Sequence, residues 1–144
     1  MSETITFETY WVGGRGAYKR ANNLTTAIEE ALHTLTYAAA PGAGGAEGPG
    51  QIYGHLGSLY TGTGNLRQAL EQMARQIQTM GRQDRMYHAN GGSVAKSAAA
   101  TTDALLAAAA GADKLTELLQ QAQNAIAPLG TKNDDDNPIY DEED

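Results

Sequence analysis

The stretch Val94–Leu129, VAKSAAATTDALLAAAAGADKLTELLQQAQNAIAPL, decides the fold. Its apolar and small residues recur at alternating intervals of four and three. The positions are Val94, Ala98, Thr101, Leu105, Ala108, Ala112, Leu115, Leu119, Ala122, Ile126 and Leu129. A mean repeat of 3.5 residues keeps one stripe of a helix facing a neighbouring helix over many turns. The spacing therefore predicts a long helix that packs lengthwise against another.

Two further stretches carry the same spacing. One runs through Ile52, Leu56, Leu59, Thr63, Leu66, Leu70, Met73, Ile77 and Met80, and the other through Ala17, Ala21, Leu24, Ile28, Ala31, Leu35 and Ala38. We therefore expect an all-α fold. It is an elongated antiparallel helical hairpin or a three-helix bundle with coiled-coil-like packing.

Glycine and proline divide the chain into three parts. These are an extended N-terminal arm with a glycine hinge (1–16), a helical bundle (17–130) and an acidic tail (131–144). Within the bundle we expect helices at 17–40, 51–88 and 93–127, with a Gly/Pro linker at 41–50, Asn90-Gly91-Gly92 as a turn and Ser93 as a helix N-cap.

The first half of the second expected helix is rich in glycine, at positions 54, 57, 62 and 64. Each glycine costs about 1 kcal/mol relative to alanine inside a helix. A break near Gly62 and a continuous helix that uses its glycines for close contact are both open, so the helicity of residues 51–64 stays undecided.

Composition indicates a thin structure that needs partners. Alanine contributes much of the apolar content, and an alanine stripe buries little area per residue. Since buried apolar area contributes roughly 25 cal/mol per Å², such a stripe stabilises the helix pair only weakly. We therefore expect partner helices from this chain or from another copy, and a homo-oligomer. The chain has no cysteine, which excludes disulfides and thiolate metal sites.

The sequence also indicates a compartment. No apolar run approaches the ~20 residues that span a bilayer. The N-terminus lacks the basic and apolar segments of a general secretory signal. We expect a cytoplasmic protein with no membrane span. Export by a specialised route is the alternative.

The net charge of −7 is concentrated at the C-terminus. Residues 1–133 carry ten basic and ten acidic side chains, whereas 134–144 carry seven acids and no base. Such a block predicts a solvated, disordered tail. The alternative is that the tail binds a basic partner. The candidate residues for this binding are Asp134, Asp135, Asp136, Tyr140 and Asp144.

We expect no enzyme, cofactor or metal site. The chain lacks Gly-x-Ser-x-Gly, cysteine nucleophiles and a Walker-type phosphate loop. Its histidines, at positions 33, 55 and 88, lie in separate segments, and zinc needs three or four converging ligands. Gly13-Gly14-Arg15-Gly16 is the nearest approach to an anion-binding helix start, and a glycine hinge explains it equally well.

Two groups of side chains are candidates for partner binding. Aromatic residues gather in the arm, where Phe7, Tyr10 and Trp11 are of the type that anchors in a partner's groove. Packing back onto the chain's own helices is the alternative. Along the second helix, Arg67, Arg75, Arg82 and Arg85 form a possible basic face that could follow phosphates. Glu71 and Asp84 interrupt this series, so a solvated helix face is the commoner explanation.

Two short resemblances accompany these patterns. Trp11-Val12-Gly13 fits Trp-x-Gly, and Tyr140 with Asp144 fits Tyr-x-x-x-Asp/Glu. With a long helical hairpin, these are similar to the WXG100-type substrates of bacterial type VII secretion, although in that family the Trp-x-Gly turn joins the two helices. The run Asp134–Ile139 is similar to the acidic tip of bacterial single-strand DNA-binding proteins, without their terminal aromatic residue.

The leading functional hypothesis is a non-enzymatic helical protein–protein interaction protein that self-assembles in a structural or adaptor role. Another protein is a possible partner through the arm or the tail. One alternative is an exported type VII-like helical substrate. The other is a nucleic-acid accessory protein of a plasmid or phage, although an acidic chain makes nucleic acid a less expected partner.

Overall fold

The computed structural model describes residues 17–132, and this part of the chain is all-α. The helices are α1 (Ala17–Ala38), α2 (Pro49–Arg82) and α3 (Val94–Ile126). The chain divides into two units, Met1–Gly45 with α1 and Ala46–Asp144 with α2 and α3. The expected N-terminal arm (1–16) and the acidic tail from residue 133 onward lie outside the described residues.

Helix α1 is amphipathic, with apolar residues at intervals of four and three. Ile28 and Leu32 are each 54% exposed and Leu35 is 38% exposed. The His33 ring meets the Tyr37 ring edge-on at 5.3 Å between centroids. The helix ends two residues before the expected Ala40, because Ala40 precedes Pro41 and a residue before proline is disfavoured in helical backbone.

Helix α2 is continuous from Pro49 to Arg82, so no break occurs near Gly62. It starts two residues earlier than expected, with Pro49 in the first turn, where proline's fixed φ suits a helix and its missing N–H is not needed. The backbone N–H of Gly48 donates to Oε1 of Gln51 at 2.8 Å. This contact satisfies a backbone donor at the helix start. Packing against α3 then stabilises the helical conformation despite the low helix propensity of the glycines.

Helix α2 ends at Arg82, six residues before the expected end. The Asp84 N–H donates to the Gly81 carbonyl at 3.3 Å, and the Arg85 N–H donates to the Met80 carbonyl at 3.2 Å. These two bonds form a Schellman motif, with Asp84 in the left-handed region at φ 51°. Sequence reasoning missed this stop because the left-handed position is held by aspartate instead of glycine.

Helix α3 starts where the sequence predicts. The Ser93 side chain accepts a hydrogen bond from the Lys96 N–H at 3.2 Å, so the expected N-cap is confirmed. Helix α3 is continuous through Gly111 and ends at Ile126, one residue before the expected Ala127. Within the described residues, no helix is both long enough and apolar enough to cross a bilayer.

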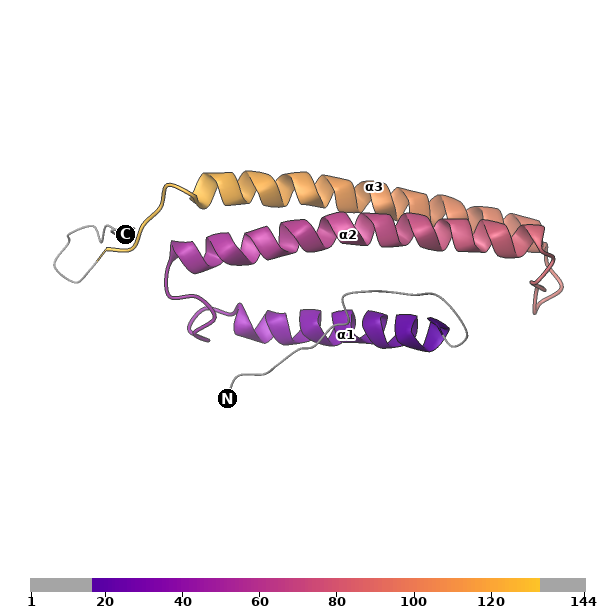
Figure 1. The fold of residues 1–144 in the computed structure, drawn as a ribbon, viewed down its shortest axis with the longest axis horizontal. Helices are drawn as coiled ribbons and strands as arrows, with labels where there is room; N and C mark the ends of the chain where they lie inside the picture. Colours follow the sequence, from indigo (N-terminus) through magenta and orange to yellow (C-terminus); the bar gives the residue numbers. More distant parts are fainter. Residues whose placement is uncertain (1–16, 133–144) are drawn as a thin grey trace. The chain divides into compact units, whose positions relative to one another are not determined.

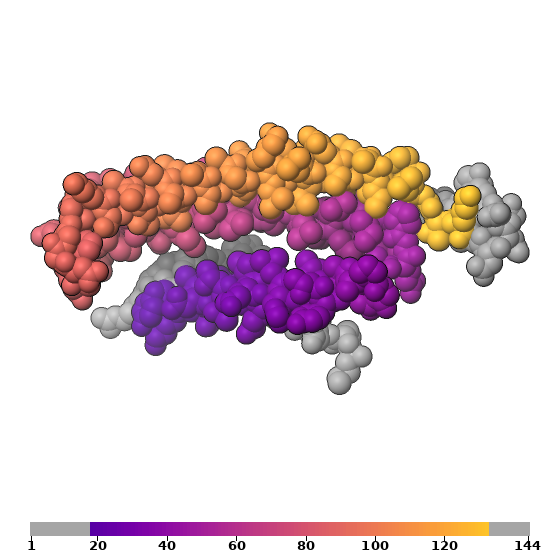
Figure 2. Space-filling model, turned by 180° about the vertical axis from the view of Figure 1, so that it is seen from behind, coloured from indigo at the N-terminus to yellow at the C-terminus, as the bar shows by residue number. Residues whose placement is uncertain are grey.

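Helices α2 and α3 pack side by side as an antiparallel hairpin (Figures 1 and 2). Three polar contacts define their register. The hydroxyls of Thr63 and Thr116 share a hydrogen bond at 2.7 Å. Nε of Arg67 lies 3.3 Å from Oδ1 of Asp113. Nε2 of Gln123 donates to the Tyr53 carbonyl at 3.2 Å. Residue numbers rise along one helix as they fall along the other, as an antiparallel pairing requires.

The contact stripe differs from the expected one by one residue at every second position. In heptad notation, the facing positions a and d of α2 are Leu56, Tyr60, Thr63, Arg67, Leu70, Ala74 and Ile77, all at least half-buried. Those of α3 are Ala98, Thr102, Leu105, Ala109, Ala112, Thr116, Leu119, Gln123 and Ile126. The expected positions Leu66, Met73, Met80, Thr101, Ala108, Leu115 and Ala122 are exposed.

Small side chains explain this shift. Ala74, Ala109 and Ala112 are the buried apolar residues of the described part of the chain, and Thr102 is the buried polar one. Small residues at the contact let two helix axes come close. Leu66, Met73, Met80 and Leu115 then lie along one flank of the contact instead of in its centre.

Gly54→Ala tests the continuity of α2. Gly54 is exposed, and a Cβ added there meets nothing within 4 Å. In a continuous helix this change should raise the free energy of unfolding by about 0.5–1 kcal/mol, measured by urea denaturation. The control is Gly91→Ala in the turn between α2 and α3, where φ is +70° and alanine should be destabilising. No gain at Gly54 would contradict helical structure there.

Ala74→Leu tests the register of the contact. Ala74 is 2% exposed, so a leucine there overpacks the interface and should lower the free energy of unfolding by about 1–3 kcal/mol. The neighbouring Met73 is 39% exposed, and Met73→Leu should change stability by about 0.5 kcal/mol at most. The measurement is urea denaturation at low protein concentration. Equal effects of the two substitutions would disprove the register.

Candidate functional site

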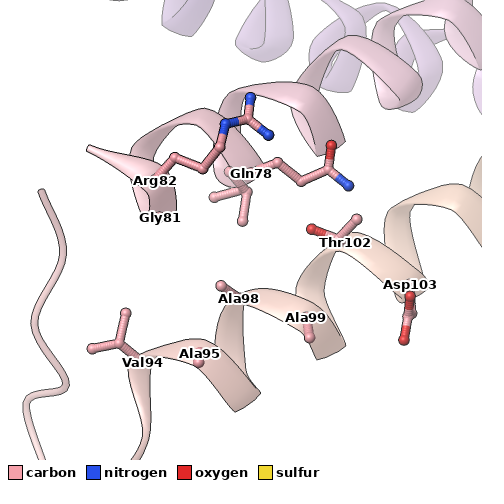
Figure 3. A pocket seen from close by; sticks show the side chains of 10 residues that line it. Gln78, Gly81, Arg82, Val94, Ala95, Ala98, Ala99, Thr102 and Asp103 are labelled. Carbon is pink, nitrogen blue, oxygen red and sulfur yellow. The ribbon is translucent and has the colours of Figure 1, made fainter. Parts of the chain in front are cut away.

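A groove opens between the C-terminal end of α2 and the N-terminal end of α3. It encloses about 650 Å³ and is lined by Ile77, Gln78, Gly81, Arg82, Val94, Ala95, Ala98, Ala99, Thr102 and Asp103. Figure 3 shows Gln78 and Arg82 on α2, with the small side chains of α3 below them. None of these ten residues is Ser, Cys, His or Lys, so the groove does not assemble the usual nucleophile–base pairs. Its alanine floor suits an apolar side chain better than a reacting group.

Charged side chains gather on this same side of the hairpin. Arg67 lies at an a position and turns toward the e positions of both helices. Its Nη1 lies 2.8 Å from Oε1 of Glu71, and its Nε contacts Asp113. The remaining charged residues of α2 and α3 lie at positions b and f, and they are Arg75, Arg82, Lys96, Asp103, Lys114 and Glu117. None of the charged residues on these two helices occupies position c, d or g.

The opposite side of the hairpin carries most of the exposed large apolar side chains of α2 and α3, apart from Tyr53 and Leu106. In an antiparallel pair the g positions of both helices lie on one side and the e positions on the other. We define the lateral face as the c and g positions of α2 and α3. It comprises Ile52, His55, Leu59, Gly62, Leu66, Ala69, Met73, Gln76 and Met80 of α2, with Val94, Ser97, Thr101, Ala104, Ala108, Gly111, Leu115, Leu118, Ala122 and Ala125 of α3.

Large side chains on the lateral face are well exposed. Leu66 is 42% exposed, Leu115 46% and Leu118 49%. The register set by Thr63 and Thr116 places Leu66 and Leu115 within two residues of the same level of the hairpin. The two helices therefore contribute to one continuous apolar surface. Contiguous exposed apolar surface is rare on monomeric proteins and often marks a binding site.

The turn between α2 and α3 limits the lateral face at one end. Met86 and His88 are half-buried there. A hollow of about 130 Å³ lies among Ile77, Met86, Tyr87, His88, Val94, Ser97, Ala98 and Thr101. The hollow joins Ile77 of α2 and the turn to the c and g positions Val94, Ser97 and Thr101 of α3.

The structure does not bring the four expected arginines together. Arg67 pairs with Glu71 on its own helix and with Asp113 across the interface. Arg75 and Arg85 line one shallow surface hollow, and Arg82 lies at the groove. The Arg75 and Arg82 guanidinium groups donate to the side chains of Gln72 and Thr79 on the same helix, at 3.1 and 3.2 Å. This arrangement is typical of a solvated helix face.

The described histidines lie apart from one another. His33 packs on Tyr37 in α1, and Nδ1 of His88 accepts from the Asn90 N–H at 3.2 Å in the turn. Across residues 17–132, no three His, Asp or Glu side chains converge in a way that could hold a metal ion.

The other expected site residues cannot be placed. Phe7, Tyr10 and Trp11 of the arm lie outside the described residues. So do Asp134, Asp135, Asp136, Tyr140 and Asp144 of the tail. Partner binding by either group stays a prediction, as do the short resemblances that rest on them.

Sequence reasoning missed the polar residues that join the two helices. Thr63 was expected in the contact, whereas Arg67, Thr116 and Gln123 were not. Their signal is positional: each lies four residues after a contact residue, at Thr63, Ala112 and Leu119 respectively. An apolar pattern alone does not reveal them.

Comparison with known proteins adds no relative. No protein-family model, no curated protein and no solved structure matches this chain.

Proposed function

We propose that this chain is a non-enzymatic helical protein–protein interaction protein that self-assembles, in a structural or adaptor role. One observation carries the proposal. Of the residues that the structure describes, only alanine and threonine are buried in the hairpin's interface, its leucines are half-buried, and further leucines and methionines stay exposed along one flank.

Energetics support the need for a partner. Burying apolar area contributes roughly 25 cal/mol per Å², so three buried alanines supply little of the free energy that a hairpin of this length requires. Among the described residues, no large side chain is fully buried. Association that covers the leucines and methionines would supply the missing burial.

Helix α1 supports the same proposal by itself. Its Ile28, Leu32 and Leu35 follow one helix face and remain exposed. An amphipathic helix with an exposed apolar face is typical of an element that packs on a further helix. Both units of the chain therefore offer apolar helical surface for assembly.

Sedimentation velocity across a concentration series, from low to high micromolar, tests self-assembly. We expect a mass of two or more chains at the upper end and dissociation on dilution, because the exposed leucines and methionines are covered only in the assembly. Unfolding temperature should rise with concentration in the same series. A compact species with the mass of one chain at every concentration would contradict the proposal.

A further inference from the structure

The lateral face identifies both the surface and the partner. Resting on the proposed function, we propose that two copies pair through their lateral faces, with α2 of each copy lying on α3 of the other. The product is an assembly of four hairpin helices in which neighbouring helices run antiparallel.

Charge favours a second copy as the occupant. The lateral face has no Asp, Glu, Lys or Arg over the length of both helices, while the opposite side holds the ion pairs of Arg67. A charged partner surface would lose hydration here without gaining an opposite charge. The same face of a second copy is free of charge at the same levels, so it meets this condition with no other protein required.

The area of the lateral face is also large enough for a stable dimer. From Ile52 to Met73 the face extends for about 32 Å, at ~1.5 Å per residue. Two helices packed 8–10 Å apart, each about 10 Å across, make it about 20 Å wide. Pairing would thus cover about 600 Å² on each copy, or about 1,200 Å² in total, which reaches the range of specific interfaces.

Two glycines on the face suit close approach. A Cβ added at Gly62 or at Gly111 meets nothing within 4 Å, so neither glycine is required by contacts inside the described chain. Glycine inside a helix is nevertheless costly. A backbone or a large side chain from a second copy would use the space that each one leaves open.

The register pairs these glycines with larger residues. The levels set by Arg67 and Asp113 put Gly62 level with Leu118 and Ala69 level with Gly111. When α2 of one copy lies on α3 of the other, the two-fold axis runs along the hairpins and keeps these levels together. Leu118 of each copy then fills the space at Gly62 of the other.

Glycine-to-leucine variants test the surface. Gly62→Leu and Gly111→Leu should preserve helix content by circular dichroism, and should weaken association by about tenfold or more in sedimentation velocity, because the added side chains overpack the pairing. The matched control is Gly54→Leu. Gly54 lies at a b position with equally open space around it, so its variant should associate like the parent chain.

Cysteine pairs test the orientation, in a chain that has no native cysteine. Oxidation of Gly62→Cys combined with Leu118→Cys should give covalent dimers. The c positions point away from the neighbouring helix of the same hairpin, and a disulfide needs Cα atoms within about 7 Å, so this pair does not close within one chain. Gly54→Cys with Leu118→Cys is the control. Equal yields from the two pairs, or no dimer from the first, would overturn the inference.

The outcomes separate this inference from the proposed function. A parent chain that stays monomeric contradicts both. A parent that associates while Gly62→Leu and Gly111→Leu associate equally well overturns the lateral pairing and leaves self-assembly in place. If the double variant Ile28→Glu, Leu32→Glu loses association while the glycine variants are unaffected, the interface between copies is formed by α1 and not by the lateral face.

Discussion

The close pairing of α2 with α3 is the constraint on which the rest of the hairpin depends. Alanines at positions 74, 109 and 112 allow the helices to approach, and the Thr63–Thr116 hydrogen bond lies within the contact they form. Hydrogen bonds require particular distances and angles, whereas contacts between alanines change little in energy when one helix shifts along the other. Threonine, arginine and glutamine therefore specify the register, and the small residues supply proximity.

Once this register is set, the two flanks of the hairpin acquire opposite characters. The Arg67 side chain lies between Glu71 and Asp113, both at e positions, and the other charged residues of the two helices lie at b and f. The c and g positions hold Leu59, Leu66, Met73, Met80, Leu115 and Leu118. Rotating either helix about its own axis would place charged and apolar residues on the same flank. The small residues buried in the contact therefore determine where the exposed large residues lie. The segregation is a property of the pair, since neither helix alone defines a flank.

Much of this architecture was predictable from spacing. Ser93 identified the start of α3, Pro128 and Gly130 located its end to within one residue, and the 4-3 repeat predicted the helical hairpin. The contact register was half right. Leu56, Leu70, Leu105 and Leu119 do face the partner helix, whereas Leu66 and Leu115 do not. Apolar spacing finds the most apolar stripe, and in this chain that stripe and the stripe of closest contact differ by one residue in each heptad.

Two local features escaped prediction for physical reasons. The glycines at positions 54, 57, 62 and 64 suggested a break, because propensity counts each residue separately, whereas packing along the hairpin stabilises the helix as a whole. The end of α2 was placed six residues late, since Asp84 adopts a backbone conformation usually reserved for glycine. The candidate surface was visible only after the register was known, because the sequence assigned its g positions, such as Leu66 and Leu115, to the interior.

The scarcity of fully buried large side chains has a thermodynamic consequence. Heat-capacity change and denaturant sensitivity both scale with the surface newly exposed on unfolding. An isolated hairpin of this kind should melt over a broad temperature range along a shallow stability curve. Covering the leucines and methionines would increase both quantities, so calorimetry would see a sharper, more cooperative transition in the assembled protein than in the dilute one.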